Sequence, residues 1–301
     1  MIFETTAPGQ KRRKLREELA TGKLLQFPGA FSPLVAQLIE DLNFDGVYIS
    51  GGVLSTDLAL PDIGLTTLTE VSQRGRAISR VTNLPSIIDI DTGFGEPMSV
   101  ARTVIEMQEM GLSGAHLEDQ VNPKRCGHLD NKSIVSQEDM CRKIRAASDA
   151  KFDEKFLLIA RTDSRASEGL DNAIARAKAY VDAGAEMIFP EALQDESEFE
   201  RFRKEIKVPL LANMTEFGKS KLLDKATLEN LGFNMVIYPV TGWRLAMKAV
   251  EDGFRAIKEK GTQEPILDRM QTRKRLYEIV RYEEYNDFDK DIFNFSQDGH
   301  N

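Results

Sequence analysis

The stretch SIIDIDTGFG, residues 86–95, joins a short apolar run to a polar turn. Near-continuous apolar runs of this kind suit parallel strands that are covered on both faces. Segments with helical patterns separate it from seven further runs of the same kind: LLQFPGA, GVYIS, GAHLED, LLIAR, MIFPE, PLLAN and MVIYP. The sequence therefore predicts eight parallel strands that alternate with helices.

Helix start and stop signals fall between these runs. A cap followed by proline, or a capping box, predicts a helix start at each of four places: Ser32-Pro33, Thr67 to Glu70, Ser136 to Asp139 and Ser197 to Glu200. Gly111 and Gly184 stand where helix C-termini are expected.

Eight strand–helix units in about 240 residues match the size of a (β/α)8 TIM barrel. A doubly wound open sheet is the competing fold, but no GxGxxG turn or P-loop is present. We expect one domain over residues 1–301, in which residues 262–301 form a C-terminal helical extension. Such additions often pack on a neighbouring subunit, so we expect an oligomer.

Composition limits the classes of partner. The 301 residues carry a net charge of −8 with no basic patch interleaved with aromatics, which argues against nucleic acid. No run resembles a signal peptide or approaches the ~20 apolar residues of a membrane span. Two cysteines give no disulfide framework, so we expect free thiols and a cytoplasmic protein. The basic run 11–14 is interpreted as the solvated face of a first helix.

The predicted strands end in polar residues, and a barrel of this kind places its active site at those ends. The residues at or after the strand ends are Ser50, Gly51, Gly52, Asp89, Asp91, Glu118, Asp119, Arg161, Glu191, Asn213 and Arg244.

Asp89 and Asp91 give the most specific of these signals. Two apart on an extended segment, they point the same way and can converge on a hard divalent cation that retains waters, as Mg²⁺ prefers. Glu118 follows one strand away and supports this interpretation. The alternative is an Asx turn that closes the strand before Gly93.

Cys126 lies in the polar stretch DQVNPKRCGHLDNKS after the fourth strand, a connection longer than a tight turn and suited to a lid. Lys124 and Arg125 beside it would favour the thiolate and so allow the thiol to serve as a proton donor. The alternative is an inert surface cysteine. Cys141 falls within a predicted helix and His116 within a predicted strand, and neither is assigned a role.

The chain resembles the isocitrate lyase and phosphoenolpyruvate mutase superfamily, and is most similar to its 2-methylisocitrate-cleaving branch. The resemblance covers nearly the whole chain through FPGAFSPLVAQLIE, YISGG, LPDIGLTTLTEV, DIDTGFGE, HLEDQVNPKRCGH, IARTDSRA, IFPEAL, ANMTEFG and MQTRKRLYE. The K-[KR]-C-G-H loop is the lyase signature, because other branches have different residues there.

The resemblance implies roles for particular residues. Asp89, Asp91 and Glu118 would form the metal site for Mg²⁺, with Mn²⁺ as an alternative ion. Cys126 would be the catalytic thiol, and Tyr48 is our candidate for the base. Residues implied to contact the substrate are Ser50, Gly51, Gly52, Asp62, Cys126, Gly127, Arg161, Glu191, Asn213, Thr215, Arg244 and Arg273.

The resemblance further implies a barrel whose eighth helix is exchanged between subunits, usually in a tetramer. The implied reaction splits the tricarboxylate 2-methylisocitrate into pyruvate and succinate, as in propionate breakdown, with Cys126 as general acid rather than nucleophile. The alternatives are an isocitrate lyase, a carbon–carbon hydrolase or decarboxylase of oxaloacetate-like acids, and a non-catalytic barrel that senses a metal and a dicarboxylate.

Overall fold

The computed structural model describes residues 6–125, 127 and 133–295. Each of the eight apolar runs forms a strand, and all of the strand pairs are parallel. The strands are β1 (Leu25–Pro28), β2 (Val47–Ile49), β3 (Ser86–Asp89), β4 (Gly114–Glu118), β5 (Leu157–Thr162), β6 (Met187–Pro190), β7 (Leu211–Asn213) and β8 (Met235–Tyr238).

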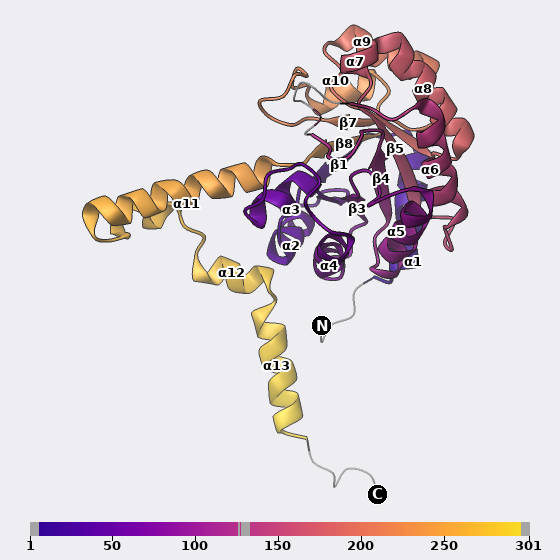
Figure 1. The fold of residues 1–301 in the computed structure, drawn as a ribbon. Helices are drawn as coiled ribbons and strands as arrows, with labels where there is room; N and C mark the ends of the chain where they lie inside the picture. The colour runs from indigo at the N-terminus through magenta and orange to yellow at the C-terminus, as the bar shows by residue number, and fades with distance from the viewer. Residues whose placement is uncertain (1–5, 126, 128–132, 296–301) are drawn as a thin grey trace, which may run out of the picture. The chain divides into compact units, whose positions relative to one another are not determined.

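The strands close into the predicted barrel. Strands β2 to β6 pair in sequence order, and β1, β8 and β7 form a second set in which the first strand pairs with the last. Two parallel bridges join the sets, Gly29 with Tyr48 and Ile188 with Leu210. The helices surround these strands (Figure 1).

Most helix signals are confirmed. The side chains of Ser32 and Ser136 cap helices, Thr67 and Glu70 form a complete capping box, and Gly111 and Gly184 have positive φ at helix ends. The box expected at Ser197 is wrong, because Asp195 caps that helix two residues earlier. The helices to this point are α1 (Pro8–Ala20), α2 (Pro33–Asp41), α3 (Gly51–Asp57), α4 (Leu68–Ser79), α5 (Pro97–Glu109), α6 (Gln137–Asp149), α7 (Arg165–Glu168), α8 (Leu170–Ala183), α9 (Glu196–Glu205) and α10 (Lys225–Asn230).

Helix α1 differs from its predicted role as a solvated basic helix. Leu15 and Leu19 join the apolar cluster inside the barrel, and this places two residues of the basic run against the protein. Lys11 and Arg12 are each 3% exposed. Lys11 donates to Ser79 O and Thr82 O, and Arg12 donates to Leu112 O and Gln108 O. These cations therefore satisfy carbonyls at the ends of α4 and α5.

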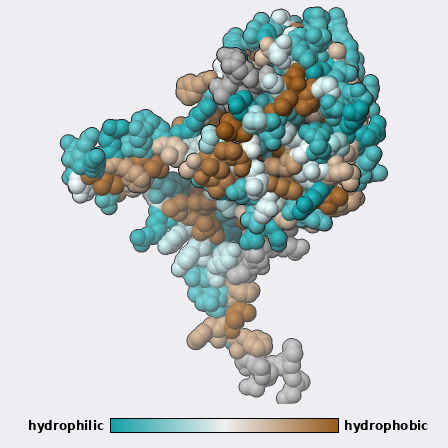
Figure 2. Space-filling view, viewed as in Figure 1, coloured by the Kyte–Doolittle hydropathy of each residue, from teal (hydrophilic) through white to brown (hydrophobic). Residues whose placement is uncertain are grey.

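The described residues divide into two compact units, 6–244 and 245–295. The second begins within α11 (Thr241–Lys260) and continues through η1 (Glu264–Arg269), α12 (Arg273–Ile279) and α13 (Tyr282–Phe293). Neither α11 nor α13 contains a buried residue, and apolar side chains line one side of α11 (Figure 2). Within the described ranges, no helix is long and apolar enough to cross a membrane.

Candidate active site

A cavity of about 80 Å³ lies at the C-terminal ends of the barrel strands. Every strand except β1 and β4 contributes a lining residue at its end or just after it, and the longer connection after β4 contributes two. The lining residues are Tyr48, Ser50, Gly52, Asp62, Asp89, Lys124, Gly127, Arg161, Phe189, Glu191, Asn213, Thr215, Pro239 and Val240.

Asp89 and Asp91 converge as predicted, but through a turn rather than an extended segment. Strand β3 ends at Asp89, and Asp91 has left-handed backbone (φ 47°). The Asp91 N–H donates to Asp89 Oδ1 at 3.0 Å, which is the Asx-type contact of the alternative interpretation. The Gly51 N–H donates to Asp89 Oδ2 at 3.3 Å, and a Cβ on Gly51 would lie 2.9 Å from that oxygen. A larger residue at position 51 would therefore crowd the carboxylates.

Lys124 is buried among these acids. Its Nζ pairs with Asp62 and lies 2.9 Å from Asp91 Oδ1. Burial alone would lower the pKa of Lys124, but Asp91, Glu118, Asp89 and Asp62 together raise it above its usual value. The ammonium is therefore charged and directed at carboxylates, whereas the sequence led us to expect it to stabilise a thiolate.

Arg161 is surrounded by three carboxylates. It donates to both oxygens of Asp163, and its Nε and Nη2 lie 3.4 Å and 3.2 Å from Glu118 and Glu191. The register of the sheet explains the contact with Glu118, since Glu118 pairs with Arg161 across β4 and β5. The guanidinium also stands over the ring of Phe189, with 5.1 Å to the centroid. Arg161 is thus fixed in place before any substrate arrives.

The acids present hard oxygen donors to a cation. Burial raises the pKa of Glu118 well above its usual value and, together with the charge of Asp89, raises that of Asp91 to about 6. Glu118 Oε1 is buried and has no hydrogen-bond partner among the described residues. No three acidic, histidine or cysteine side chains of the described part of the chain are grouped closely enough to hold a metal by themselves. The donor set still suits Mg²⁺, which is commonly bound by one or two carboxylates and retained waters.

Tyr48 and His116 form a buried pair beneath the cavity. The Tyr48 hydroxyl lies 2.7 Å from His116 Nε2, and His116 Nδ1 lies 3.7 Å from Asp89 Oδ1. Burial lowers the pKa of His116 to about 4, so the imidazole is neutral and its Nε2 can accept a hydrogen bond from the Tyr48 hydroxyl. Burial and the charge of Asp89 raise the pKa of Tyr48 well above its usual value, so at neutral pH this hydroxyl keeps its proton.

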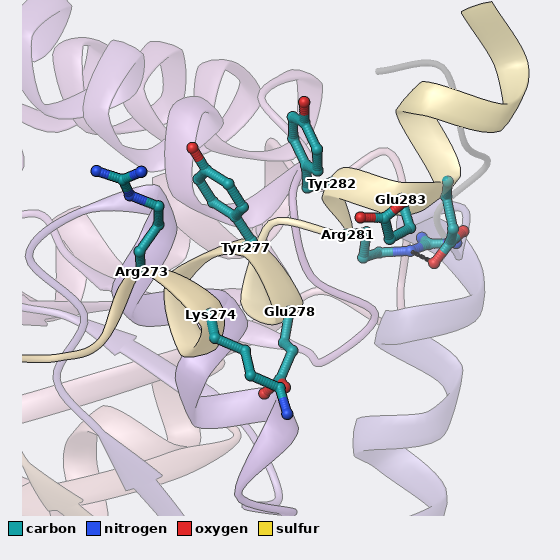
Figure 3. Close-up of a pocket in the computed structure, with 8 residues that line it drawn as sticks. Arg273, Lys274, Tyr277, Glu278, Arg281, Tyr282 and Glu283 are labelled. Carbon is teal, nitrogen blue, oxygen red and sulfur yellow. Dashed lines mark hydrogen bonds and ion pairs between the residues drawn. The ribbon is translucent and has the colours of Figure 1, made fainter. Parts of the chain in front are cut away.

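The predicted site residues are brought together with three exceptions. Arg244 does not line the cavity: its Nη1 donates to Glu216 O and Glu216 Oε2, and it stacks over Phe217. Arg273 belongs to the C-terminal unit. There it borders a separate pocket of about 690 Å³ with Tyr277 and Tyr282, whose rings stack at 4.6 Å (Figure 3). Cys126 lies outside the described residues, but Lys124 and Gly127 on either side of it line the cavity.

Sequence reasoning missed the carboxylate partners of Lys124, the hydrogen bond of His116 and the pairing of Arg161 with Asp163. The last of these had a signal, because Arg161 and Asp163 stand two apart at the end of β5 and so share a face. Nothing in the local sequence connects His116 with Tyr48, which is 68 residues away.

Residues 15–258 match the phosphoenolpyruvate phosphomutase family. A protein of Corynebacterium glutamicum named probable 2-methylisocitrate lyase 2 is 56% identical, over 100% of this chain and 98% of that protein. The 2-methylisocitrate lyase of Halalkalibacterium halodurans is 47% identical over 93% and 92%.

Solved structures share the fold. Oxaloacetate acetylhydrolase in complex with 3,3-difluorooxalacetate superposes with a TM-score of 0.89 at 30% identity, covering 97% of this chain and all of that one. Phosphonopyruvate hydrolase in complex with oxalate and Mg²⁺ gives a TM-score of 0.84 at 31% identity, over 92% and 96%.

Proposed function

This chain belongs to the phosphoenolpyruvate phosphomutase family, and we propose that it is a lyase that cleaves 2-methylisocitrate into pyruvate and succinate. The observation that carries the proposal is the identity of about half of all positions with 2-methylisocitrate lyases, over nearly the full length of both chains. The cavity supports it, because most residues that the sequence assigned to that reaction surround one space at the strand ends.

The charges at this cavity support a requirement for a divalent cation. Among the described residues, two cations face six carboxylates: Lys124 and Arg161 against Asp62, Asp89, Asp91, Glu118, Asp163 and Glu191. A tricarboxylate adds three negative charges at neutral pH, since carboxylic acids ionise near pH 4. Additional positive charge must therefore accompany the substrate.

We propose that Asp89 and Asp91, with Glu118 nearby, hold Mg²⁺. The phosphonopyruvate hydrolase structure, which contains that ion with oxalate, supports the proposal. When bound, Mg²⁺ would act as a Lewis acid toward the hydroxyl and the adjacent carboxylate of the substrate.

The polar groups on the cavity wall can hold the remaining carboxylates. The Ser50 Oγ accepts from the Val53 N–H, so its own hydrogen is available to donate toward the substrate. Asn213 Nδ2 already lies 3.3 Å from Glu191, and Thr215 follows it on the same wall. Donors that are fixed where charge develops stabilise a carbanion beside a carboxylate without reorganisation during the reaction.

Two proton movements accompany the break of the carbon–carbon bond. The substrate hydroxyl becomes a carbonyl as its proton passes to Tyr48 Oη, while the tyrosine proton passes to His116 Nε2, 2.7 Å away. The electron pair of the broken bond stays on the carbon of the succinate fragment. The Cys126 thiol supplies the proton that this carbon takes up, as a general acid.

Product formation with 2-methylisocitrate and isocitrate in parallel tests the proposal, with Mg²⁺ present and pyruvate and glyoxylate assayed separately. We expect pyruvate at the higher kcat/KM, with some glyoxylate, since one methyl group is worth only ~1–3 kcal/mol of discrimination. Preference for isocitrate would make the chain an isocitrate lyase. Activity on neither would favour an oxaloacetate-type reaction, which oxalate and acetate release from oxaloacetate would reveal, or a non-catalytic sensor.

We also propose that the chain assembles as a homotetramer through its C-terminal unit. Residues 245–295 expose many large apolar side chains, among them Leu245, Phe254, Leu267, Ile292 and Phe293. Exposed apolar groups in this number are typical of a surface that another protein covers. A second copy of this chain fits the exchange of helices that the sequence resemblance implies.

A further inference from the structure

Gln120 makes two hydrogen bonds to the backbone of one loop residue near the cavity. The Arg125 N–H donates to Gln120 Oε1 at 2.8 Å, and Gln120 Nε2 donates to Arg125 O at 2.8 Å. An amide side chain offers one acceptor and two donors, so it can satisfy both backbone groups of a residue at once. Because the backbone N–H can only donate and the carbonyl can only accept, only one orientation of the amide fits.

The backbone of Gln120 is itself held firmly. Gln120 pairs with Ile134 in an antiparallel bridge, and the hydrogen bonds Val121 N to Ser133 O and Val135 N to Asp119 O flank that bridge at 2.8 Å each. The residue is 1% exposed. Its side chain therefore connects a fixed point at the end of β4 to a residue five positions further along the connection.

Arg125 stands between two residues that touch the cavity. Lys124 pairs there with Asp62 and Asp91. Gly127 packs so closely that a Cβ at this position would overlap the side chains of Arg161 and Glu191. The placement of both residues depends on the backbone of Arg125, since they are its neighbours at one and two positions.

We propose that Gln120 is a positioning residue, which fixes Lys124 and Gly127 at the cavity by clamping the backbone of Arg125. This role of Gln120 in catalysis rests on the proposed function, because Gln120 acts on groups that contact the substrate rather than on the substrate itself. A displacement of about 1 Å in such groups can cost ~10²-fold in rate.

Gln120→Met tests the clamp, because methionine keeps the length of the side chain and removes both hydrogen bonds. Gln120→Glu keeps the acceptor for the Arg125 N–H but sets a carboxylate oxygen against the Arg125 carbonyl. Gln108→Met is the matched control. Gln108 is also buried, 3% exposed, and its Oε1 accepts from the N–H groups of Phe152 and Asp153. It lies at the end of α5 that leads into β4, away from the cavity.

Hydrogen–deuterium exchange and steady-state kinetics provide independent measurements. In Gln120→Met we expect the Arg125 amide to exchange at least about tenfold faster, and kcat/KM to fall about 10- to 100-fold. Gln120→Glu should show a similar loss of kcat/KM, with less change in exchange. Gln108→Met should lower the thermal midpoint about as much as Gln120→Met does. It should change neither the exchange of the Arg125 amide nor kcat/KM.

Each outcome decides a separate question. Unchanged exchange at Arg125 in Gln120→Met would overturn the clamp. Faster exchange with kcat/KM no lower than in Gln108→Met would show that the clamp does not serve the site, and would overturn the positioning role. A wild-type protein without lyase activity would end the proposed function, and the exchange measurement would then decide whether Gln120 holds the segment.

Discussion

The left-handed backbone at Asp91 decides which groups of the site meet. A non-glycine residue seldom adopts this conformation, and asparagine and aspartate adopt it more readily than others, because their short side chains bond locally. Here the turn directs the Asp91 carboxylate toward Lys124 while its N–H is bonded to Asp89. The sequence predicted that Asp89 and Asp91 lie together, on the assumption that the segment is extended. They do lie together, but because of the left-handed turn at Asp91.

Asp89→Ala should weaken Mg²⁺ binding and turnover together. The substitution removes one carboxylate of the proposed metal pair and the acceptor for the Asp91 N–H. Calorimetric titration with Mg²⁺ measures binding directly, and kcat at saturating Mg²⁺ measures the second effect. Asp153→Ala, which removes a carboxylate far from the cavity, is the control. A Mg²⁺ titration equal to that of the wild type would place the metal elsewhere.

Cys126→Ser should lose most turnover and keep substrate binding. A serine hydroxyl is a much weaker acid than a thiol, and loss of a general acid typically lowers the rate by ~10²–10⁴-fold. Cys141→Ser should leave kcat unchanged, because Cys141 lies on α6 with its thiol near Ala179 O. The comparison requires kcat and KM for both variants. Turnover near the wild-type rate in Cys126→Ser would rule out the thiol as the acid.

The residues that sequence reasoning could not place share one property. The partners of Lys124, His116 and Arg244 lie 28 to 68 positions away in the chain, at Asp62, Tyr48 and Glu216. Such contacts depend on strand register and loop conformation, which short patterns do not encode. The expectation that residues at the strand ends line one cavity was correct for Asp89 and Glu191, because it needs only the position of each strand.

At the scale of the element, α1 shows how packing overrides a charge pattern. A run of cations beside two glutamates is typical of a solvated face, yet the apolar residues of α1 turn part of that run inward. The buried cations then find carbonyls at helix ends, where positive charge is favourable. The pattern of charge alone could not indicate this, because the carbonyls lie 68 to 100 residues later, at or just after the ends of other helices.

Lys11 should make the free energy of unfolding depend on alkaline pH. Burial lowers the pKa of Lys11 to about 8, and in the unfolded chain it returns to the ordinary value near 10.5. Between these values the unfolded state binds more protons, so stability rises with pH across that window. The neutral amine can still donate to the carbonyls of Ser79 and Thr82.

Urea denaturation at pH 8 and pH 9.5 measures this effect. The difference in unfolding free energy between wild type and Lys11→Met should shift by up to about 2 kcal/mol in favour of the wild type at the higher pH. Lys14→Met, at an exposed position of the same helix, should show no such shift. A difference that stays constant with pH would show that Lys11 does not titrate in this window.

At the scale of the whole molecule, the barrel was predictable because eight repeats of one pattern must share one architecture. The closure of the sheet between β1 and β8 then follows from the number of strands and the size of the fold. The breaks between η1, α12 and α13 were not predicted. They fall at Met270–Thr272, which is extended or outside a helix, and at Arg281, where φ is 58° in the left-handed region.

The C-terminal unit leads to a prediction about assembly. On α11, Met247, Val250, Phe254 and Ile257 recur at helical spacing and are all exposed. Such a stripe is costly in water, and a tetramer of this chain would cover it. Size-exclusion chromatography with light scattering should therefore give four times the mass of one chain.

Phe254→Ser should shift the wild-type assembly to a lower mass, because it removes the most exposed aromatic side chain of the α11 stripe, at 69% exposed. Arg255→Ser alters the neighbouring residue, whose guanidinium pairs with Glu251 on the polar side, and should leave the mass unchanged.

If the wild-type chain is monomeric at micromolar concentration, the tetramer is excluded. If Phe254→Ser retains the full mass under dilution, the α11 stripe is not the contact, and the other exposed apolar residues of the unit, from Leu267 to Phe293, become the candidates. A loss of assembly that leaves kcat/KM intact would further show that the barrel cavity is complete within one chain, whereas a joint loss would support a contribution of Arg273 to the site, as the sequence resemblance implies.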